Sequence, residues 1–245
     1  MFKRGFALLA LFLLAANLFA GDPWKDKPYK QWDEKDIRKI MTESPWVKGV
    51  SVEKTWGGVG LAATAPTLGA SSSAASSEPR DVARGATPST EERPQAVFVF
   101  RWASSRTIRR ALARRALLLR GIPGADAEQF LAQEPVEYQV VVLGADMTLF
   151  AKADEKESKA MREKSYLASR KSKTRLAPDR IEIERTPDGK NVLAVHFYFA
   201  KKTAAGEPAL SPKDKGAEFV CQIGGITMKA NFDFQKLVDS QGVDL

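Results

Sequence analysis

The hydrophobic and polar positions near the N-terminus predict a short helix that ends at a proline. Ile37, Ile40 and Met41 are spaced so that they form one apolar stripe along a helix. Asp33 precedes this stripe, and its short carboxylate can accept a hydrogen bond from a first-turn amide. Pro45 disfavours helical geometry in the residue before it and cannot donate a backbone hydrogen bond. A helix is therefore expected to begin after Asp33 and to end before Pro45.

Alternating or uniformly apolar runs predict strands in the rest of the chain. The segment 50–56 alternates, whereas 96–102 is apolar on both faces until Arg101, as in a central strand. A helix with a single strand has no sheet partner, so these two segments are expected to pair antiparallel. A Pro-Asp-Gly turn signal separates two further alternating runs. The other expected strands are 136–143, 180–185, 192–199, 218–223 and 226–234.

Helical periodicity with recognisable ends predicts further helices. Ser104 or Ser105 can cap a helix that continues through an arginine-rich stretch, and Asp126 with Gln129 resembles a capping box. A later, highly charged stretch with a thin apolar stripe is typical of a solvated helix. The expected helices are 33–43, 105–120, 126–133 and 154–170, with a short tail helix near Leu237. The sequence therefore predicts an α+β fold, a mostly antiparallel sheet with three to four helices.

Composition divides the chain into four segments. Residues 57–95 are rich in Gly, Ala, Ser, Thr and Pro and contain no aromatic residue. Such a segment cannot bury enough apolar surface to offset the cost of ordering the chain, so we expect a disordered insertion. The length permits two domains, but the expected strand pairing favours one discontinuous domain. The expected segments are a signal peptide 1–20, a helix–strand segment 21–56, the insertion 57–95 and the main domain 96–245.

The N-terminal residues have the composition of a secretory signal. Lys3 and Arg4 supply its positive charge, and Phe6 to Ala16 is an apolar run too short for a stable membrane span. Cleavage after Ala20 would release a secreted or periplasmic protein, and an uncleaved anchor is the alternative. Loss of Lys3 and Arg4 lowers the formal net charge from +8 to +6. We expect no transmembrane span in the mature chain.

Tryptophans concentrate at the junction of the first helix and strand. Trp32, Trp46 and Trp56 are three of the five tryptophans, and Trp102 ends the next expected strand. Large aromatic side chains usually serve packing, so we interpret these four as a structural aromatic cluster that holds the helix on the sheet. The alternative is an exposed platform for a sugar or a peptide.

The same stretch carries a resemblance to known families. The pattern Trp32-x3-Asp36-Ile37-x2-Ile40-Met41-x2-Ser44-Pro45-Trp46 resembles the opening of a group of uncharacterised bacterial secreted proteins. Its first part is also similar to the secreted GWxTD-domain proteins, although the Gly-Trp-x-Thr-Asp signature does not occur in this chain. The resemblance implies secretion, and it implies no catalytic residue.

An arginine-rich helix is the candidate binding surface. Its guanidinium groups share about half of the helix circumference and can bind phosphates or carboxylates in bidentate fashion. Export argues against nucleic acid and favours an anionic lipid, an acidic glycan or an acidic protein surface as the partner. The alternative is an ordinary solvated helix face. The candidate binding residues are Arg106, Arg109, Arg110, Arg114 and Arg120.

Arg115 differs from these five arginines because it falls within the apolar face of the same helix. Leu112 and Leu119 are expected to face inward beside it. Arg115 must therefore reach an acid, extend to solvent along its stem, or lie at an interface.

The sequence gives little support for catalysis. A single histidine, His196, lies in the middle of an expected strand, and the single cysteine, Cys221, lies in an apolar run typical of a buried strand. Too few His and Cys residues are present for a zinc site, and no P-loop or dinucleotide motif occurs, so we expect no metal and no cofactor. We expect a non-enzymatic interaction protein. The alternative is an extracytoplasmic hydrolase that uses Glu182 and Glu184, or His196.

Overall fold

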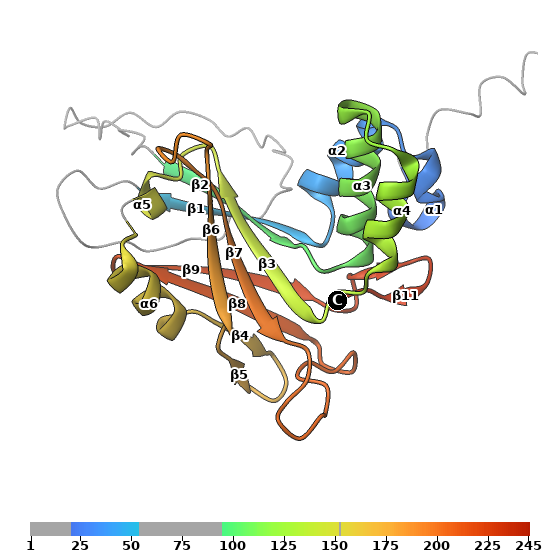
Figure 1. Cartoon of the computed structure of the whole chain (residues 1–245). Coiled ribbons are helices and arrows are strands. Elements are labelled where there is room, and N and C mark those ends of the chain that lie inside the picture. The colour runs from blue at the N-terminus through green and yellow to red at the C-terminus, as the bar shows by residue number, and fades with distance from the viewer. Residues whose placement is uncertain (1–20, 54–94, 152) are drawn as a thin grey trace, which may run out of the picture.

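The computed structural model describes residues 21–53, 95–151 and 153–245 (Figure 1). Trp56, the expected signal peptide and nearly all of the expected insertion lie outside the described residues. The α-helices are α1 (Pro23–Asp26), α2 (Glu34–Glu43), α3 (Arg106–Arg120), α4 (Gly124–Ala132), α5 (Thr148–Ala151) and α6 (Glu155–Lys164), with a 3₁₀ helix η1 (Tyr29–Gln31).

All of the strand pairings in the described chain are antiparallel. One sheet has the order β1-β2-β3-β7-β6, a second has the order β5-β4-β8-β9, and β10 and β11 form a C-terminal hairpin. The α+β fold class is therefore confirmed. The strands are β1 (Val47–Glu53), β2 (Gln95–Trp102), β3 (Glu137–Gly144), β4 (Tyr166–Ser169), β5 (Arg175–Leu176), β6 (Arg180–Arg185), β7 (Val192–Ala200), β8 (Gly216–Ile223), β9 (Ile226–Asp233), β10 (Val238–Asp239) and β11 (Gly242–Val243).

The two larger sheets pack their apolar faces against each other to form the core (Figure 1). The ring of Phe219 on β8 lies 5.4 Å from that of Phe100 on β2 and 5.0 Å from that of Phe197 on β7, both edge to face. Trp102 meets Phe232 of β9 in the same way, at 5.1 Å. Each of these rings is fully buried, so the aromatic positions of β2, β7, β8 and β9 that face this interface form the centre of the core. The expected pairing of β1 with β2 is confirmed.

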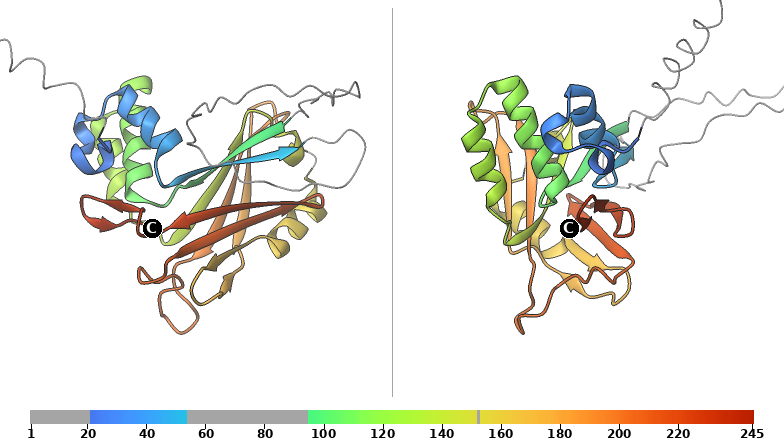
Figure 2. Two further views of the ribbon diagram at one scale, coloured as in Figure 1. Left: turned by 180° about the vertical axis from the view of Figure 1, so that it is seen from behind. Right: turned by 90° about the vertical axis from the view of Figure 1, so that its right-hand side faces the viewer.

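Helices α1 to α4 gather at one end of the molecule, beside the ends of β1 and β2 (Figures 1 and 2). Asp33 caps α2 and forms a reciprocal capping box with Asp36, so the predicted start of this helix is confirmed. Ser105 caps α3, and Gly121 ends it in the left-handed conformation with φ of 61°. The stripe of α2 packs into the core, where Ile40 is fully buried.

The structure corrects three predicted elements. Helix α4 begins at Gly124, after Pro123, and the expected capping box of Asp126 with Gln129 does not open it. The charged helix ends at Lys164, and the chain continues as β4 because Leu167 lies opposite Phe219 of β8 and is fully buried. The expected tail helix is the β10–β11 hairpin. At β4, pairing with a distant segment overrode a local pattern.

The described tryptophans of the expected aromatic cluster are buried, as a packing role requires. Trp32, Trp46 and Trp102 expose at most 2% of their surface. Trp46 meets the ring of Trp24 edge to face at 5.9 Å, and its Nε1 donates to the backbone oxygen of Asp244 at 2.8 Å. These three side chains therefore cannot form the exposed platform, and Trp46 also anchors the C-terminus.

Candidate anion-binding cleft

Two arginines of α3 are neutralised inside the fold. Asp239 of β10 exposes 1% of its side chain and accepts from Arg106 Nη2 at 3.0 Å and from Arg110 Nη1 at 3.3 Å. The paired carboxylate is the largest contribution to the raised pKa of Arg106. A buried carboxylate requires such partners, so these two guanidinium groups hold the C-terminal hairpin against α3.

The first turn of α3 binds a second carboxylate from the C-terminus. The Asp244 side chain accepts from the backbone nitrogens of Arg106 at 2.6 Å and Thr107 at 2.9 Å, and it is almost fully buried. The first amides of a helix have no partner within the helix, and the positive end of its dipole favours an acid there. Asp244 therefore acts as a cap supplied by a distant part of the chain.

Two more arginines of α3 also bind within the protein. Arg109 donates to the backbone oxygen of Phe130, and its guanidinium lies 4.7 Å from the centre of the Phe130 ring. Arg114 Nε donates to the backbone oxygen of Trp32 at 2.9 Å. Arg106 and Arg110 therefore pair with a buried carboxylate of the same protein, whereas Arg109 and Arg114 each have a backbone acceptor and no ion pair with a described carboxylate. Anion binding by Arg106, Arg109, Arg110, Arg114 and Arg120 stays a prediction. Arg120 is exposed at the C-terminal end of α3.

Arg101 is an arginine in a different setting, on the outward face of β2. Its Nη2 donates to the backbone oxygen of Met41 at 3.0 Å, whereas its buried Nε has no partner among the described residues. Burial, together with the charge of Arg115, lowers the pKa of Arg101 to about 10. No carboxylate of the described chain offsets this cost, which is unusual for a largely buried cation.

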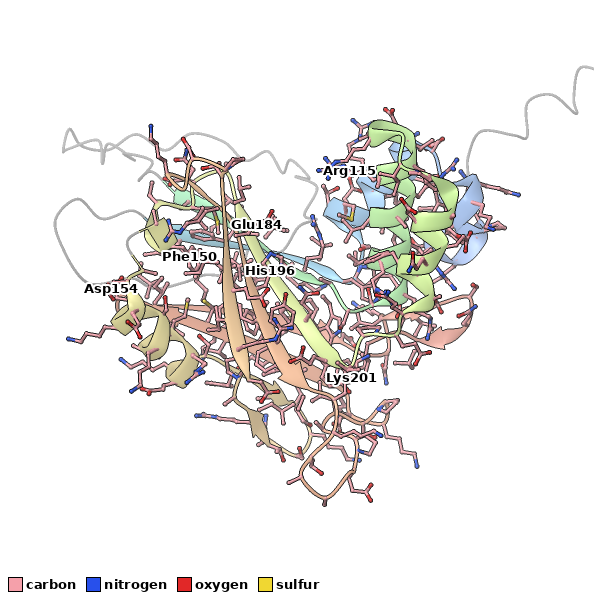
Figure 3. All side chains as sticks on the ribbon, in the orientation of Figure 1. Arg115, Phe150, Asp154, Glu184, His196 and Lys201 are labelled. Atoms are coloured by element: carbon pink, nitrogen blue, oxygen red, sulfur yellow. The ribbon has the colours of Figure 1, made fainter. Side chains whose placement is uncertain are left out.

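Arg101 lies in a cleft between α2 and α3 with a volume of about 360 Å³. Buried apolar side chains of α2 form one wall, and Arg115 and Leu119, one turn apart on α3, form the other. Figure 3 shows Arg115 on the upper part of α3. The lining residues are Glu34, Ile37, Arg38, Met41, Thr42, Arg101, Arg115 and Leu119. Three arginines face one glutamate, so the cleft has a positive charge and apolar walls.

The expected inward orientation of Leu112 and Leu119 is wrong. Leu119 exposes 56% of its surface and Leu112 exposes 37%, and both lie beside Arg115. A second cleft of about 390 Å³ lies between α3 and α4, and Arg115 lines it as well. Leu112 and Phe130 form part of its apolar lining. Arg115 is therefore exposed to solvent between the two clefts, with apolar surface on either side. Extension to solvent is one of the three outcomes expected for this residue.

The residues of the hydrolase alternative lie on the outward face of β6 and β7 (Figure 3). His196 Nε2 lies 3.1 Å from a Glu184 carboxylate oxygen, and His196 Nδ1 lies 3.0 Å from Gln139 Nε2. Glu182 instead accepts from the Tyr198 hydroxyl at 2.9 Å. Both imidazole nitrogens are thus occupied by protein groups, and neither is free to activate a nucleophile.

Cys221, the single cysteine, does not supply an accessible nucleophile. Cys221 is fully buried in β8, and burial raises the pKa of its thiol to about 12, so the reactive thiolate does not form near neutral pH. Among the described residues, no group of three or more His, Cys, Asp or Glu side chains could hold a metal ion. In the same part of the chain, every helix is too short or too polar to cross a bilayer.

Comparisons with known proteins give no further assignment. A scan against protein-family models and searches of curated proteins and of solved structures found no match. The resemblance of Trp32–Trp46 to secreted bacterial proteins therefore stays a prediction.

Sequence reasoning missed Arg101, although a signal was present. Arg101 interrupts a run that is otherwise apolar on both faces of β2, and a charge at such a position needs a partner or a function. The sequence could not show that the partner is absent, because this requires the positions of α2 and α3. Arg115 is exposed together with Leu112 and Leu119, so the apolar positions beside it do not face the core.

Proposed function

We propose that this is a secreted or periplasmic, non-enzymatic binding protein whose α2–α3 cleft takes an anionic amphiphile, a lipid-like molecule with a carboxylate or phosphate head group. The observation that carries the proposal is the buried guanidinium of Arg101, which has no carboxylate partner among the described residues and opens into the cleft. A group with a strongly perturbed pKa in a cleft is a candidate for function.

The chemistry of the cleft favours this class of ligand. The planar guanidinium groups of Arg101 and Arg115 match the oxygens of a carboxylate or phosphate. An apolar tail would cover mainly the exposed Leu119, with the edges of Ile37 and Met41 as the opposite wall, and burial of apolar surface contributes about 25 cal/mol per Å². The cleft volume of about 360 Å³ falls within the range of small-molecule sites, about 300–1,000 Å³. An acidic glycan has no tail to use these walls.

Titration calorimetry with dodecyl phosphate and dodecanoate tests the proposal. Arg115→Gln should weaken binding of both by about tenfold or more, the effect of losing about 1.4 kcal/mol. Arg162→Gln is the matched control, because Arg162 is exposed near the C-terminal end of α6 and does not line the cleft. Dodecanol, which has the tail without the charge, should bind more weakly than either anion. Equal affinity of wild type and Arg115→Gln, or no binding by wild type, would overturn the proposal.

The hydrolase alternative has weaker support. The contact between His196 and Glu184 is its one favourable observation. However, Gln139 occupies the other imidazole nitrogen, so the histidine is held within a hydrogen-bonded surface network. We therefore keep binding as the proposed activity.

A further inference from the structure

A third cleft, lined mainly by polar residues, lies on the outward face of the sheet β5-β4-β8-β9. Its volume is about 520 Å³. The sheet register places Arg175, Ala168, Glu218 and Asn231 in one row across four strands, so their side chains share this face. The polar residues that line the cleft are Tyr166, Ser169, Arg170, Lys173, Arg175, Glu218 and Asn231.

Three of these side chains are cations that the fold leaves without an acid. Arg170, Lys173 and Arg175 are exposed, and none forms an ion pair with a described carboxylate. This distinguishes them from Arg106 and Arg110, which are neutralised by Asp239. The cleft therefore carries net positive charge, with Glu218 as its single lining acid.

The turn that carries the cations is fixed by the fold. Ser169 Oγ accepts from the backbone nitrogens of Lys171 at 3.2 Å and Ser172 at 3.1 Å, and the nitrogen of Arg170 donates to the Gly216 oxygen at 2.8 Å. Lys173 has a positive φ of 60°, which is uncommon for a residue with a side chain. Because this backbone is already ordered, less conformational entropy is lost when a ligand binds.

The remaining groups match a sugar rather than a simple anion. Glu218 and Asn231 lie directly opposite each other on β8 and β9, and they offer a carboxylate acceptor beside an amide that both donates and accepts. Such a pair can bind neighbouring hydroxyl groups. The Arg175 guanidinium lies 4.3 Å from the centre of the Tyr166 ring, which gives the site a flat wall.

We propose that this cleft binds an anionic sugar, whose carboxylate or phosphate contacts Arg170 and Lys173 and whose hydroxyls contact Glu218 and Asn231. The site is independent of the α2–α3 cleft. The two lie at opposite ends of the molecule, with α2 and α3 at the top and β4 and β5 at the bottom in every view (Figures 1 and 2).

Binding measurements on the full chain can separate the sugar from the charge. The probes are trigalacturonate, a hexose phosphate, neutral maltotriose and inorganic phosphate. Wild type should bind the first two and bind maltotriose and inorganic phosphate at least about tenfold more weakly. The two anionic probes also distinguish a uronate from a phosphosugar as the source of the charge.

Matched variants locate the site. Arg170→Gln with Lys173→Gln should lower affinity for the anionic sugars about tenfold or more, whereas Lys159→Gln with Arg162→Gln on α6 removes the same charge and should change little. Asn231→Ala should weaken binding of the sugars and leave inorganic phosphate unaffected. Should a variant not fold, the side-chain amide signals of Asn231 in wild type, followed by NMR, should shift on addition of trigalacturonate.

Three results would overturn this proposal. The first is that wild type binds none of the sugars. The second is that it binds inorganic phosphate as tightly as the hexose phosphate. The third is that it binds vesicles of anionic phospholipid and none of the sugar probes. The last would indicate a basic surface for membranes without sugar recognition. Arg115→Gln should retain sugar binding, so failure of the α2–α3 cleft and failure of this site are distinguishable.

Discussion

Arginines near α3 occur in two settings that differ in how their charge is compensated. Arg106 and Arg110 share the buried carboxylate of Asp239. Arg101 is largely buried beside Arg115, and the described chain places no carboxylate on it. The charges of Arg106 and Arg110 are thus neutralised within the fold. The charges of Arg101 and Arg115 are not, so a ligand can neutralise them. Position on the helix alone does not separate the two settings, because Arg110 and Arg115 both lie on α3 and only Arg110 forms an ion pair with a described carboxylate.

This difference changes the meaning of an arginine-rich helix. A guanidinium group that holds a distant segment of its own chain contributes to stability, and its removal should unfold the protein before it reveals any binding defect. A guanidinium group whose charge is uncompensated costs stability, and its removal should affect binding first. Removing a neutralised arginine should therefore lower stability, whereas removing an uncompensated arginine should lower affinity without lowering stability.

The largest expected effect comes from removing the neutralised pair. Arg106→Gln with Arg110→Gln leaves the Asp239 carboxylate buried without a cation, so the free energy of unfolding should fall by about 3 kcal/mol. This is the lower end of the usual range, since Arg106 is partly exposed to water. Urea denaturation measures it. The control is Arg120→Gln with Arg162→Gln, and an equal loss in that variant would contradict the distinction between the two settings.

The cap from the C-terminus should contribute less. Asp244→Ala removes an acceptor from two amides in the first turn of α3, and the free energy of unfolding should fall by about 2 kcal/mol, the upper range for a helix cap. Asp126→Ala is a suitable control, because Asp126 is also in the first turn of a helix but is exposed. If both variants melt at the same temperature, Asp244 does not stabilise α3.

The smallest expected effect on stability is at the exposed member of the second pair. Arg115→Gln should change the free energy of unfolding by less than about 0.5 kcal/mol, as surface substitutions usually do. The same denaturation experiment checks this value. A loss near that of the Arg106 and Arg110 variant would mean that Arg115 is structural, and the affinity data could no longer be assigned to the ligand.

Local features of the fold were predictable from the sequence, because their causes lie within a few residues. The Asp33 cap, the Ile37, Ile40 and Met41 stripe and the end of α2 before Pro45 are examples. The β4 strand was not predictable, because its four residues lie between charged segments whose pattern also fits a continuous helix, and only pairing with β8 decides between helix and strand. Burial of Leu167 beside Phe219 stabilises the strand rather than the helix.

The site was predictable only in part, for the same physical reason. The sequence showed that α3 carries many arginines, but the acids that neutralise Arg106 and Arg110 lie more than a hundred residues away. Nothing near α3 in the chain indicates Asp239. Likewise Arg101 and Arg115 line one cleft because α2 packs against α3, so their joint charge emerges only in three dimensions.

Replacement of Arg101 by Met tests the central claim most directly, because stability and affinity are measured on one variant. Met has a similar shape without the charge, so the melting temperature should rise, by an amount equivalent to about 1 kcal/mol, once the uncompensated charge is gone. Affinity for dodecyl phosphate should fall at least about tenfold in the same sample. A variant that melts well below wild type, or one that binds dodecyl phosphate as wild type does, would contradict the account.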